Sequence, residues 1–115
     1  MRIKVYIAAP YSRGDVAVNV RTAIECGTRL WDTGLFAPYI PHLTHFWHLV
    51  TPKPYAEWLD IDNQWIPVCS AFLRLPGESS GADKEEALAR RLRIPVFYTE
   101  EGLIAYWKLS APEPG

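Results

Sequence analysis

The segment from Cys69 to Tyr98 limits the possible folds most, because it has the pattern of a parallel β-α-β unit. Ser70–Leu75 is a short apolar-rich run that ends at Pro76-Gly77, as a buried strand ending in a turn does. Helix formers follow from Gly81 to Leu92, and a second apolar run covers Ile94–Tyr98. The expected inward positions of this helix are Ala82, Ala89 and Leu92. Such a unit joins two parallel strands through a right-handed crossover.

The N-terminal part of the chain shows the same alternation of strand and helix. Arg2–Ala9 is apolar enough for a mostly buried parallel strand. Asp15 is a good N-cap for a helix that runs to about Asp32 and ends at Gly34. Leu35–Ile40 is expected to be the second strand, at a sheet edge because it contains a proline. The expected inward stripe of the helix is Val16, Val20, Ala23, Ile24, Gly27, Leu30 and Trp31.

The remaining elements complete an α/β pattern. Segment 41–54 is the least predictable part of the chain. After it, a helix is expected from Tyr55 to about Pro67, and Thr99 caps a last amphipathic helix to about Leu109. The alternation predicts a three-layer, doubly wound parallel sheet of the flavodoxin or Rossmann type. We expect four to five strands, in the order of about 2-1-3-4. Residues 1–109 form one domain, and 110–115, with two prolines, is expected to be a flexible tail.

The composition excludes several classes of partner. A net charge of -1 gives no reason to expect nucleic acid or an anionic membrane surface as a partner, and no apolar run approaches the length of a membrane helix. Cys26 and Cys69 have no CxxC spacing, which favours reduced thiols and a cytoplasmic location. No sequence pattern indicates a cofactor.

Three histidines, His42, His45 and His48, follow the second predicted strand at intervals of three. Residues three apart on a helix can share a face, but successive steps drift around the axis, and no cysteine or carboxylate at ligand spacing accompanies them. We therefore expect no metal site. The histidines are interpreted as polar wall or surface residues, with His42 or His45 lining a substrate pocket as the alternative.

Two carboxylates are the candidate reactive groups. Glu85 falls in or just after the first turn of the crossover helix, where the positive helix terminus favours an ionised carboxylate. Asp62 is four residues after Trp58 and three before Trp65, so the three can share a helix face. By pattern alone, the favoured interpretation of both carboxylates is an ordinary solvated helix charge, as it is for Glu86.

Ser79, Gly81, Glu85 and Ala87 form the pattern S-x-G-x-x-x-E followed by a small residue, which resembles the signature of the nucleoside 2-deoxyribosyltransferase family. The opening VYIAAPY resembles the first strand and loop of that family, and Asp62 resembles its second carboxylate. The resemblance covers roughly residues 4–97 and is greatest to the small bacterial and phage branch. It implies that residues 1–109 are a domain of this kind.

The resemblance also implies a reaction and a site. The reaction is cleavage or transfer at the N-glycosidic bond of a 2′-deoxyribonucleoside or its 5′-monophosphate, through a covalent glutamyl–sugar intermediate. Glu85 would be the nucleophile, Asp62 the acid–base group, and Tyr6 the residue that orients Glu85. The implied substrate-binding residues are Ala9, Pro10, Tyr11, Ser12, Arg13, His42, Trp58, Trp65, Ser79 and Gly81. The implied partners are a small nucleoside or nucleotide and further copies of the chain, as a homodimer or larger homo-oligomer.

Several residues depart from the family's pattern. Ala9 stands where many members have glycine, which narrows the approach to the sugar, and Ser70 stands where an aspartate is common. Asp83 adds negative charge near Glu85, which is expected to raise the pKa of Glu85. Ser70 and Asp83 favour the alternative of a non-catalytic domain that binds a nucleotide or nucleoside derivative on the same fold. A protein-contact role on a flavodoxin-like fold is a third interpretation.

Overall fold

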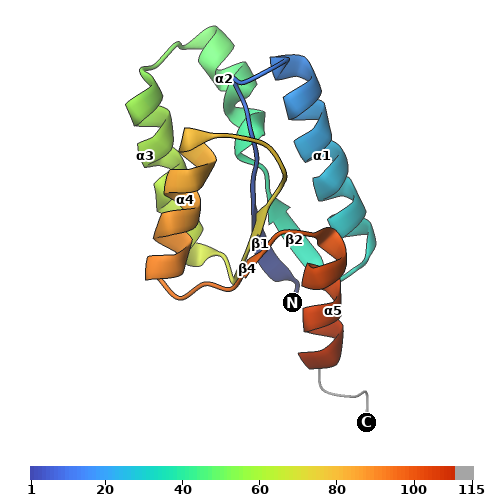
Figure 1. Ribbon diagram of the computed structural model, residues 1–115. Coiled ribbons are helices and arrows are strands. Elements are labelled where there is room, and N and C mark those ends of the chain that lie inside the picture. Colours follow the sequence, from blue (N-terminus) through green and yellow to red (C-terminus); the bar gives the residue numbers. More distant parts are fainter. Residues whose placement is uncertain (111–115) are drawn as a thin grey trace.

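The computed structural model describes residues 1–110, so the tail predicted at 110–115 lies outside the described residues except for the backbone of Ser110. Strands and helices alternate along the chain (Figure 1). The strands are β1 (Ile3–Ala8), β2 (Phe36–Tyr39), β3 (Ala71–Arg74) and β4 (Val96–Phe97). The α-helices are α1 (Val16–Asp32), α2 (Thr44–Val50), α3 (Tyr55–Trp65), α4 (Ser80–Arg91) and α5 (Glu100–Ser110). Two short 3₁₀ helices are η1 (Pro41–Leu43) and η2 (Ile66–Val68).

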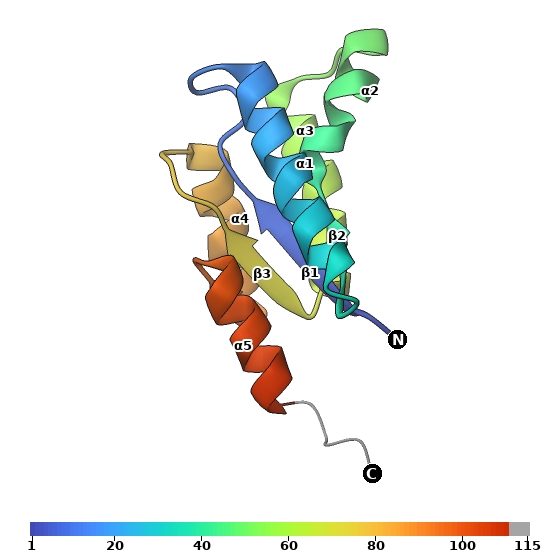
Figure 2. The same ribbon diagram turned by 90° about the vertical axis from the view of Figure 1, so that its right-hand side faces the viewer.

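The four strands form one all-parallel sheet in the order β2-β1-β3-β4. Helices α1 and α5 cover one face of this sheet, and α3 and α4 cover the other (Figures 1 and 2). This is the predicted three-layer, doubly wound α/β fold. β2 pairs only with β1 and so lies at the edge, as its Pro38 requires.

Side-chain alternation along β1 divides the core into two halves. Val5 and Ile7 point toward α1 and α5, whereas Tyr6 and Ala8 point toward α3 and α4. The first half consists of Val5, Ile7, Cys26, Leu30, Phe36, Ala71, Leu73 and Leu103. The second consists of Tyr6, Ala8, Ile66, Cys69, Phe72, Ala82 and Ala89. The alternation therefore places the Tyr6 hydroxyl on the α3/α4 side.

The ring of Tyr6 is fixed by an aromatic ladder across three strands. Tyr6 is paired in register with Tyr39 of β2 and with Phe72 of β3. Its ring stacks on both, with centroid distances of 5.4 and 5.5 Å. Cross-strand aromatic pairs of this kind stabilise a sheet beyond the area they bury. The side chain is fully buried and has little freedom to move.

The ends of the helices agree with the cap residues. The Asp15 side chain accepts hydrogen bonds from the backbone N–H groups of Ala17 and Val18, at 2.9 and 3.2 Å, and starts α1. Gly34 follows the end of this helix with a φ of +81°, a conformation that glycine adopts without strain. Ser79 caps α4 by accepting from the Ala82 N–H at 3.1 Å. These contacts fix where the chain leaves the sheet edge and enters each helix.

Two predicted inward positions were wrong. Trp31 is 51% exposed, with the Arg2 guanidinium 3.5 Å above its ring, and Cys26 occupies the buried stripe instead. Leu92 is 44% exposed because α4 ends at Arg91 and Leu92 is its C-cap. In α4 the buried positions are Ala82, Glu85 and Ala89, so a carboxylate lies on the apolar stripe.

In residues 1–110, none of the helices has both the length and the apolar character needed to span a bilayer.

Candidate active site

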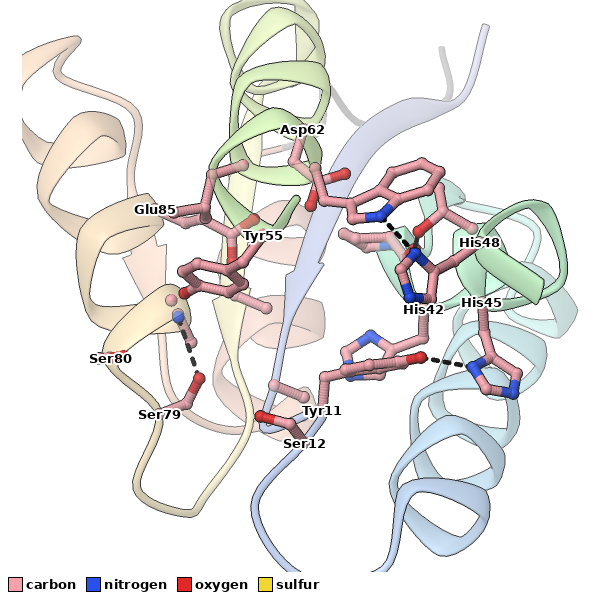
Figure 3. A pocket seen from close by; sticks show the side chains of 18 of the residues that line it. Tyr11, Ser12, His42, His45, His48, Tyr55, Asp62, Ser79, Ser80 and Glu85 are labelled. Atoms are coloured by element: carbon pink, nitrogen blue, oxygen red, sulfur yellow. Dashed lines mark hydrogen bonds between the residues drawn. The ribbon is translucent and has the colours of Figure 1, made fainter. Parts of the chain in front are cut away.

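A cavity of about 760 Å³ opens at the carboxyl ends of β1 and β3, on the α3/α4 side of the sheet. Its walls come from the β1–α1 loop, η1 and α2, the inner face of α3, and the start of α4 (Figure 3). In open parallel sheets the loops beyond the carboxyl ends of the strands form the ligand site. A volume of this size is in the range of small-molecule pockets.

The structure brings most of the predicted site residues together. Those that line the cavity are Ala9, Tyr11, Ser12, Arg13, His42, Trp58, Asp62, Ser79, Gly81 and Glu85. Tyr6 lies directly behind Glu85, and its hydroxyl donates a hydrogen bond to Oε2 of Glu85. The predicted convergence of Tyr6, Asp62 and Glu85 on one pocket is therefore present in the geometry.

Glu85 is a buried carboxyl in the second turn of α4, only 6% exposed. It shares a helix face with Ala82 and Ala89, three and four residues away, which pack on the sheet. Burial raises its pKa to about 7, while the Tyr6 hydrogen bond and the charge of Arg74 act in the opposite direction. The expectation that the helix terminus keeps Glu85 in its ionised form was incomplete, because desolvation outweighs the lowering effects.

Asp83 does not perturb Glu85 as expected. Its carboxylate is exposed and lies 2.7 Å from Nη1 of Arg74, outside the cavity. Ser70, the other departure that favoured a non-catalytic domain, is exposed and is not a cavity residue. Neither departure alters the cavity wall, whereas Ala9 contributes to it.

Asp62 is the second carboxyl of the cavity. The α3 residues Tyr55, Trp58, Leu59 and Asp62 follow helical spacing and all face the cavity. Burial, and secondly the negative charge of Glu85, raise the pKa of Asp62 to about 8. Its Oδ1 atom is buried and has no hydrogen-bond partner within residues 1–110. The cavity thus holds two carboxyls with raised pKa values, one held by Tyr6 and one without a partner at Oδ1.

Neighbouring carboxylates are placed differently. Glu86 accepts hydrogen bonds from Tyr98 Oη at 2.8 Å and from Arg90 Nε at 3.2 Å, away from the cavity. Asp60 is exposed on α3 and does not line the cavity. Both match the interpretation of ordinary helix charges.

Three predicted site residues do not line the cavity. Trp65 is 48% exposed and stacks on Tyr39, at a centroid distance of 5.5 Å, so it continues the α3 stripe past the cavity. Pro10 lines a separate cavity of about 340 Å³ on the other side of the β1–α1 loop. Its carbonyl nevertheless accepts a hydrogen bond from His42 Nε2 at 2.9 Å. Tyr6 is fully buried and acts only through its contact with Glu85.

All three histidines line the cavity, on the side opposite Glu85 and the Ser79–Ser80 turn (Figure 3). Each is held by a different group. His45 Nδ1 is hydrogen-bonded to the Tyr11 hydroxyl, and His48 Nδ1 accepts from Trp58 Nε1 at 2.8 Å. The described residues contain no cluster of three or more histidine, cysteine or carboxylate side chains able to hold a metal ion.

Sequence reasoning missed Tyr55, which precedes Trp58 by three residues and Asp62 by seven and so belongs to their helix face. A Cβ at position 81 would lie 2.5 Å from Tyr55 Oη, so a larger residue there would displace the Tyr55 hydroxyl. Lys53 was also missed. It brings an ammonium group to the cavity wall, 3.3 Å from a Glu57 oxygen, and no periodicity precedes it in the segment 41–54.

Comparisons with known proteins identify the chain at the level of its family. No curated protein matches the sequence. A family model does match, over residues 3–99, which contain every residue of the cavity wall. The model is described as Domain of unknown function (DUF7768), and the chain belongs to this family.

Proposed function

We propose that this protein cleaves, or transfers the sugar across, the N-glycosidic bond of a 2′-deoxyribonucleoside or its 5′-monophosphate. The observation that carries the proposal is the pair of carboxyls in one cavity, with the buried Glu85 held by the Tyr6 hydroxyl and the half-buried Asp62 lining the same cavity without a partner at Oδ1. Two carboxyls in one site, one as nucleophile and one as acid, are the usual machinery of retaining glycoside chemistry. The resemblance of Ser79, Gly81 and Glu85 to the nucleoside 2-deoxyribosyltransferase signature supports the same reaction.

In this proposal Glu85 is the nucleophile. With a pKa of about 7, a large fraction of Glu85 is ionised at neutral pH, and the Tyr6 hydroxyl fixes the direction of one oxygen. The free carboxylate oxygen attacks C1′, the C1′–N bond breaks, and its electron pair leaves with the base. A covalent ester between Glu85 and the deoxyribosyl group results.

Asp62 supplies the proton in this proposal. With a pKa of about 8 it is mostly protonated at neutral pH, so it can donate to the departing base. Asp62 then takes a proton from water, or from an incoming base, as that molecule attacks C1′ and releases Glu85. Water gives hydrolysis, and a second base gives transfer.

In this proposal the 5′ end of the substrate lies at Ser12 and Arg13 of the β1–α1 loop and at Ser79, the N-cap of α4. All three line the cavity, and the Arg13 guanidinium lies 3.0 Å from Glu78 on the exposed rim. Hydroxyls and an arginine beside the N-terminus of α4 suit a phosphate group. A bound 5′-phosphate could take the place of the Glu78 carboxylate beside Arg13, so that the Arg13 guanidinium would still have an anionic partner.

The direct test is to incubate the protein with a panel of 2′-deoxynucleosides and their 5′-monophosphates and measure free base. Glu85→Gln should reduce base release by at least about 10³-fold, because it removes the nucleophile. Glu86→Gln is the matched control and should leave the rate nearly unchanged, since Glu86 faces away from the cavity. A 2-fluoro-arabinosyl nucleoside should leave a covalent adduct, visible by intact-mass spectrometry, on Glu85. Equal losses in the two variants, or no base from any substrate, would refute the proposal.

A further inference from the structure

Two residues that line this cavity each have a buried polar atom without a hydrogen-bond partner within residues 1–110: Nδ1 of His42 and Oδ1 of Asp62. Buried polar side-chain atoms are nearly always hydrogen-bonded, and an unpaired one carries a desolvation cost. Both residues line one cavity, so a ligand bound there lies beside both side chains. The hydrogen-bonding character of these two atoms therefore describes the ligand.

The protonation of the His42 ring follows from its contacts. Nε2 lies 2.9 Å from the carbonyl oxygen of Pro10, and a carbonyl only accepts hydrogen bonds, so Nε2 carries the hydrogen. Burial lowers the pKa of His42, which keeps the ring neutral. Nδ1 is therefore a lone-pair acceptor. The ring is 5% exposed and packs edge-on against Tyr11, so it cannot readily turn over.

His42 differs in this respect from the other two cavity histidines. Nδ1 of His45 is already engaged with the Tyr11 hydroxyl. Nδ1 of His48 is already engaged with Trp58 Nε1 and, at 3.3 Å, with the backbone N–H of Lys53. His42 is thus the histidine of this wall that offers a ligand an unused acceptor.

We propose that His42 Nδ1 accepts a hydrogen bond from the exocyclic amino group of the base, so that the site selects 6-aminopurines and 4-aminopyrimidines over their oxo analogues. The inference rests on the proposed function in placing a nucleobase in this cavity. With the sugar at Glu85, the base extends toward the histidine wall on the opposite side (Figure 3).

Asp62 strengthens the discrimination. An amino-bearing base presents an N–H donor beside a ring nitrogen that accepts, at the N6 edge of adenine and the N4 edge of cytosine. The donor pairs with His42 Nδ1, and a protonated Asp62 donates to the ring nitrogen. Hypoxanthine and uracil place a carbonyl oxygen where the amino group stands. Two lone pairs would then face each other at His42, and the acceptor would stay unpaired.

The test is equilibrium binding of free bases, followed through the fluorescence of Trp58 in the cavity wall. Adenine is compared with hypoxanthine, and cytosine with uracil, because each pair differs in the amino and oxo groups. We expect each amino base to bind about 10- to 100-fold tighter than its oxo partner, the penalty for an unpaired buried acceptor.

Two variants separate recognition from structure. His42→Gln retains an amide N–H for the Pro10 carbonyl but offers no acceptor at the Nδ1 position, and it should reduce the preference to within about threefold. His42→Asn places a carbonyl oxygen near the Nδ1 position and should keep much of the preference. If His42 acts only by holding the Pro10 carbonyl, His42→Gln should keep the preference for amino bases and His42→Asn should lose it.

An unchanged preference in His42→Gln, tighter binding of the oxo bases, or no measurable binding of any base would overturn the inference. These readouts need no turnover, so they are independent of the proposed reaction. If no nucleoside releases its base but the amino preference is present and depends on His42, the reaction is wrong and the recognition stands.

Discussion

Glu85 and Asp62 differ from the adjacent carboxylates Glu86 and Asp60 in position only, and that difference changes their chemistry. Burial raises the pKa of the first pair to about 7 and about 8. Glu86 is instead paired with Arg90 and Tyr98, and Asp60 is exposed. Each carboxyl of the cavity therefore has a matched control one or two residues away on its own helix.

Tyr6→Phe should lower the rate of base release by about tenfold and move the acidic limb of its pH profile to higher pH. The Tyr6 hydrogen bond lowers the pKa of Glu85, so removing it raises that pKa and protonates the nucleophile at a higher pH. Phenylalanine keeps the stacks on Tyr39 and Phe72, so the melting temperature should change little. An unshifted acidic limb would argue against the orienting role.

Asp62→Asn should make stability less dependent on pH. The folded-state pKa of Asp62 is raised, from 3.8 to about 8, so the folded protein binds a proton that the unfolded chain releases. This contribution is complete below about pH 4 and is lost as the pH rises toward 8. Between pH 5 and pH 8, wild type should lose about 1–3 kcal/mol more of its unfolding free energy than Asp62→Asn.

Urea denaturation at the two pH values measures this difference. Asp60→Asn is the control, because Asp60 is exposed on the same helix and should behave as wild type. If both asparagine variants show the wild-type slope, Asp62 is not buried as the structure has it.

At the scale of elements, α3 and α4 form two walls of the cavity, and a small residue sets their separation. Gly81 at the start of α4 lies against Tyr55 at the start of α3. A Cβ at position 81 would meet Tyr55 Oη at 2.5 Å, whereas the next ring atom, Cζ, would be at 3.5 Å. The hydroxyl is therefore the part of Tyr55 that requires glycine.

Gly81→Ala should lower stability by about 1–2 kcal/mol and weaken ligand binding, because overpacking pushes Tyr55 into the cavity or α4 away from it. Tyr55→Phe removes the atom in collision, so the double variant Gly81→Ala/Tyr55→Phe should recover most of the loss. Thermal melts of the wild type, the two single variants and the double variant give the coupling energy between positions 81 and 55. If the stability losses of the two single variants add up in the double variant, the two residues do not touch.

At the scale of the whole molecule, α2 stands out because none of its residues is buried. Phe46, Trp47, Leu49 and Val50 are between 48% and 83% exposed, next to the cavity wall formed by His45 and His48. Aromatic residues such as Phe46 and Trp47 are enriched in subunit interfaces. The family resemblance implies a homodimer or larger assembly, and we expect its contact to lie at α2.

Sedimentation at micromolar concentration should give at least a dimer, and Phe46→Glu should dissociate it. Phe46 is 65% exposed and does not line the cavity, so the change tests assembly rather than the site. Val18→Glu is the control, since Val18 is similarly exposed, at 57%, but lies on α1. A monomeric wild-type protein would contradict the prediction.

Local patterns in the sequence determined the order and type of the elements. Alternating apolar runs and capped helices are short-range features, and Asp15, Gly34 and Ser79 act within a few residues of themselves. Pro38 likewise restricted its strand to an edge without any tertiary contact. The strand order agrees with the doubly wound arrangement that alternating strands and helices predict. Glu85 is spaced three and four residues from Ala82 and Ala89, but the pattern alone favoured a solvated charge at this position.

Only the tertiary structure decided which polar groups lose their contact with water. Desolvation depends on what covers a side chain, and the residues around Asp62 and Glu85 come from different helices and the sheet. The same holds for Trp65, which continues the face of Trp58 and Asp62 but stacks on Tyr39 outside the cavity. His42 is the clearest example, because its acceptor is defined by the Pro10 carbonyl, 32 residues earlier in the chain. Helical spacing shows which side chains share a face, but the packing of distant segments determines what that face meets.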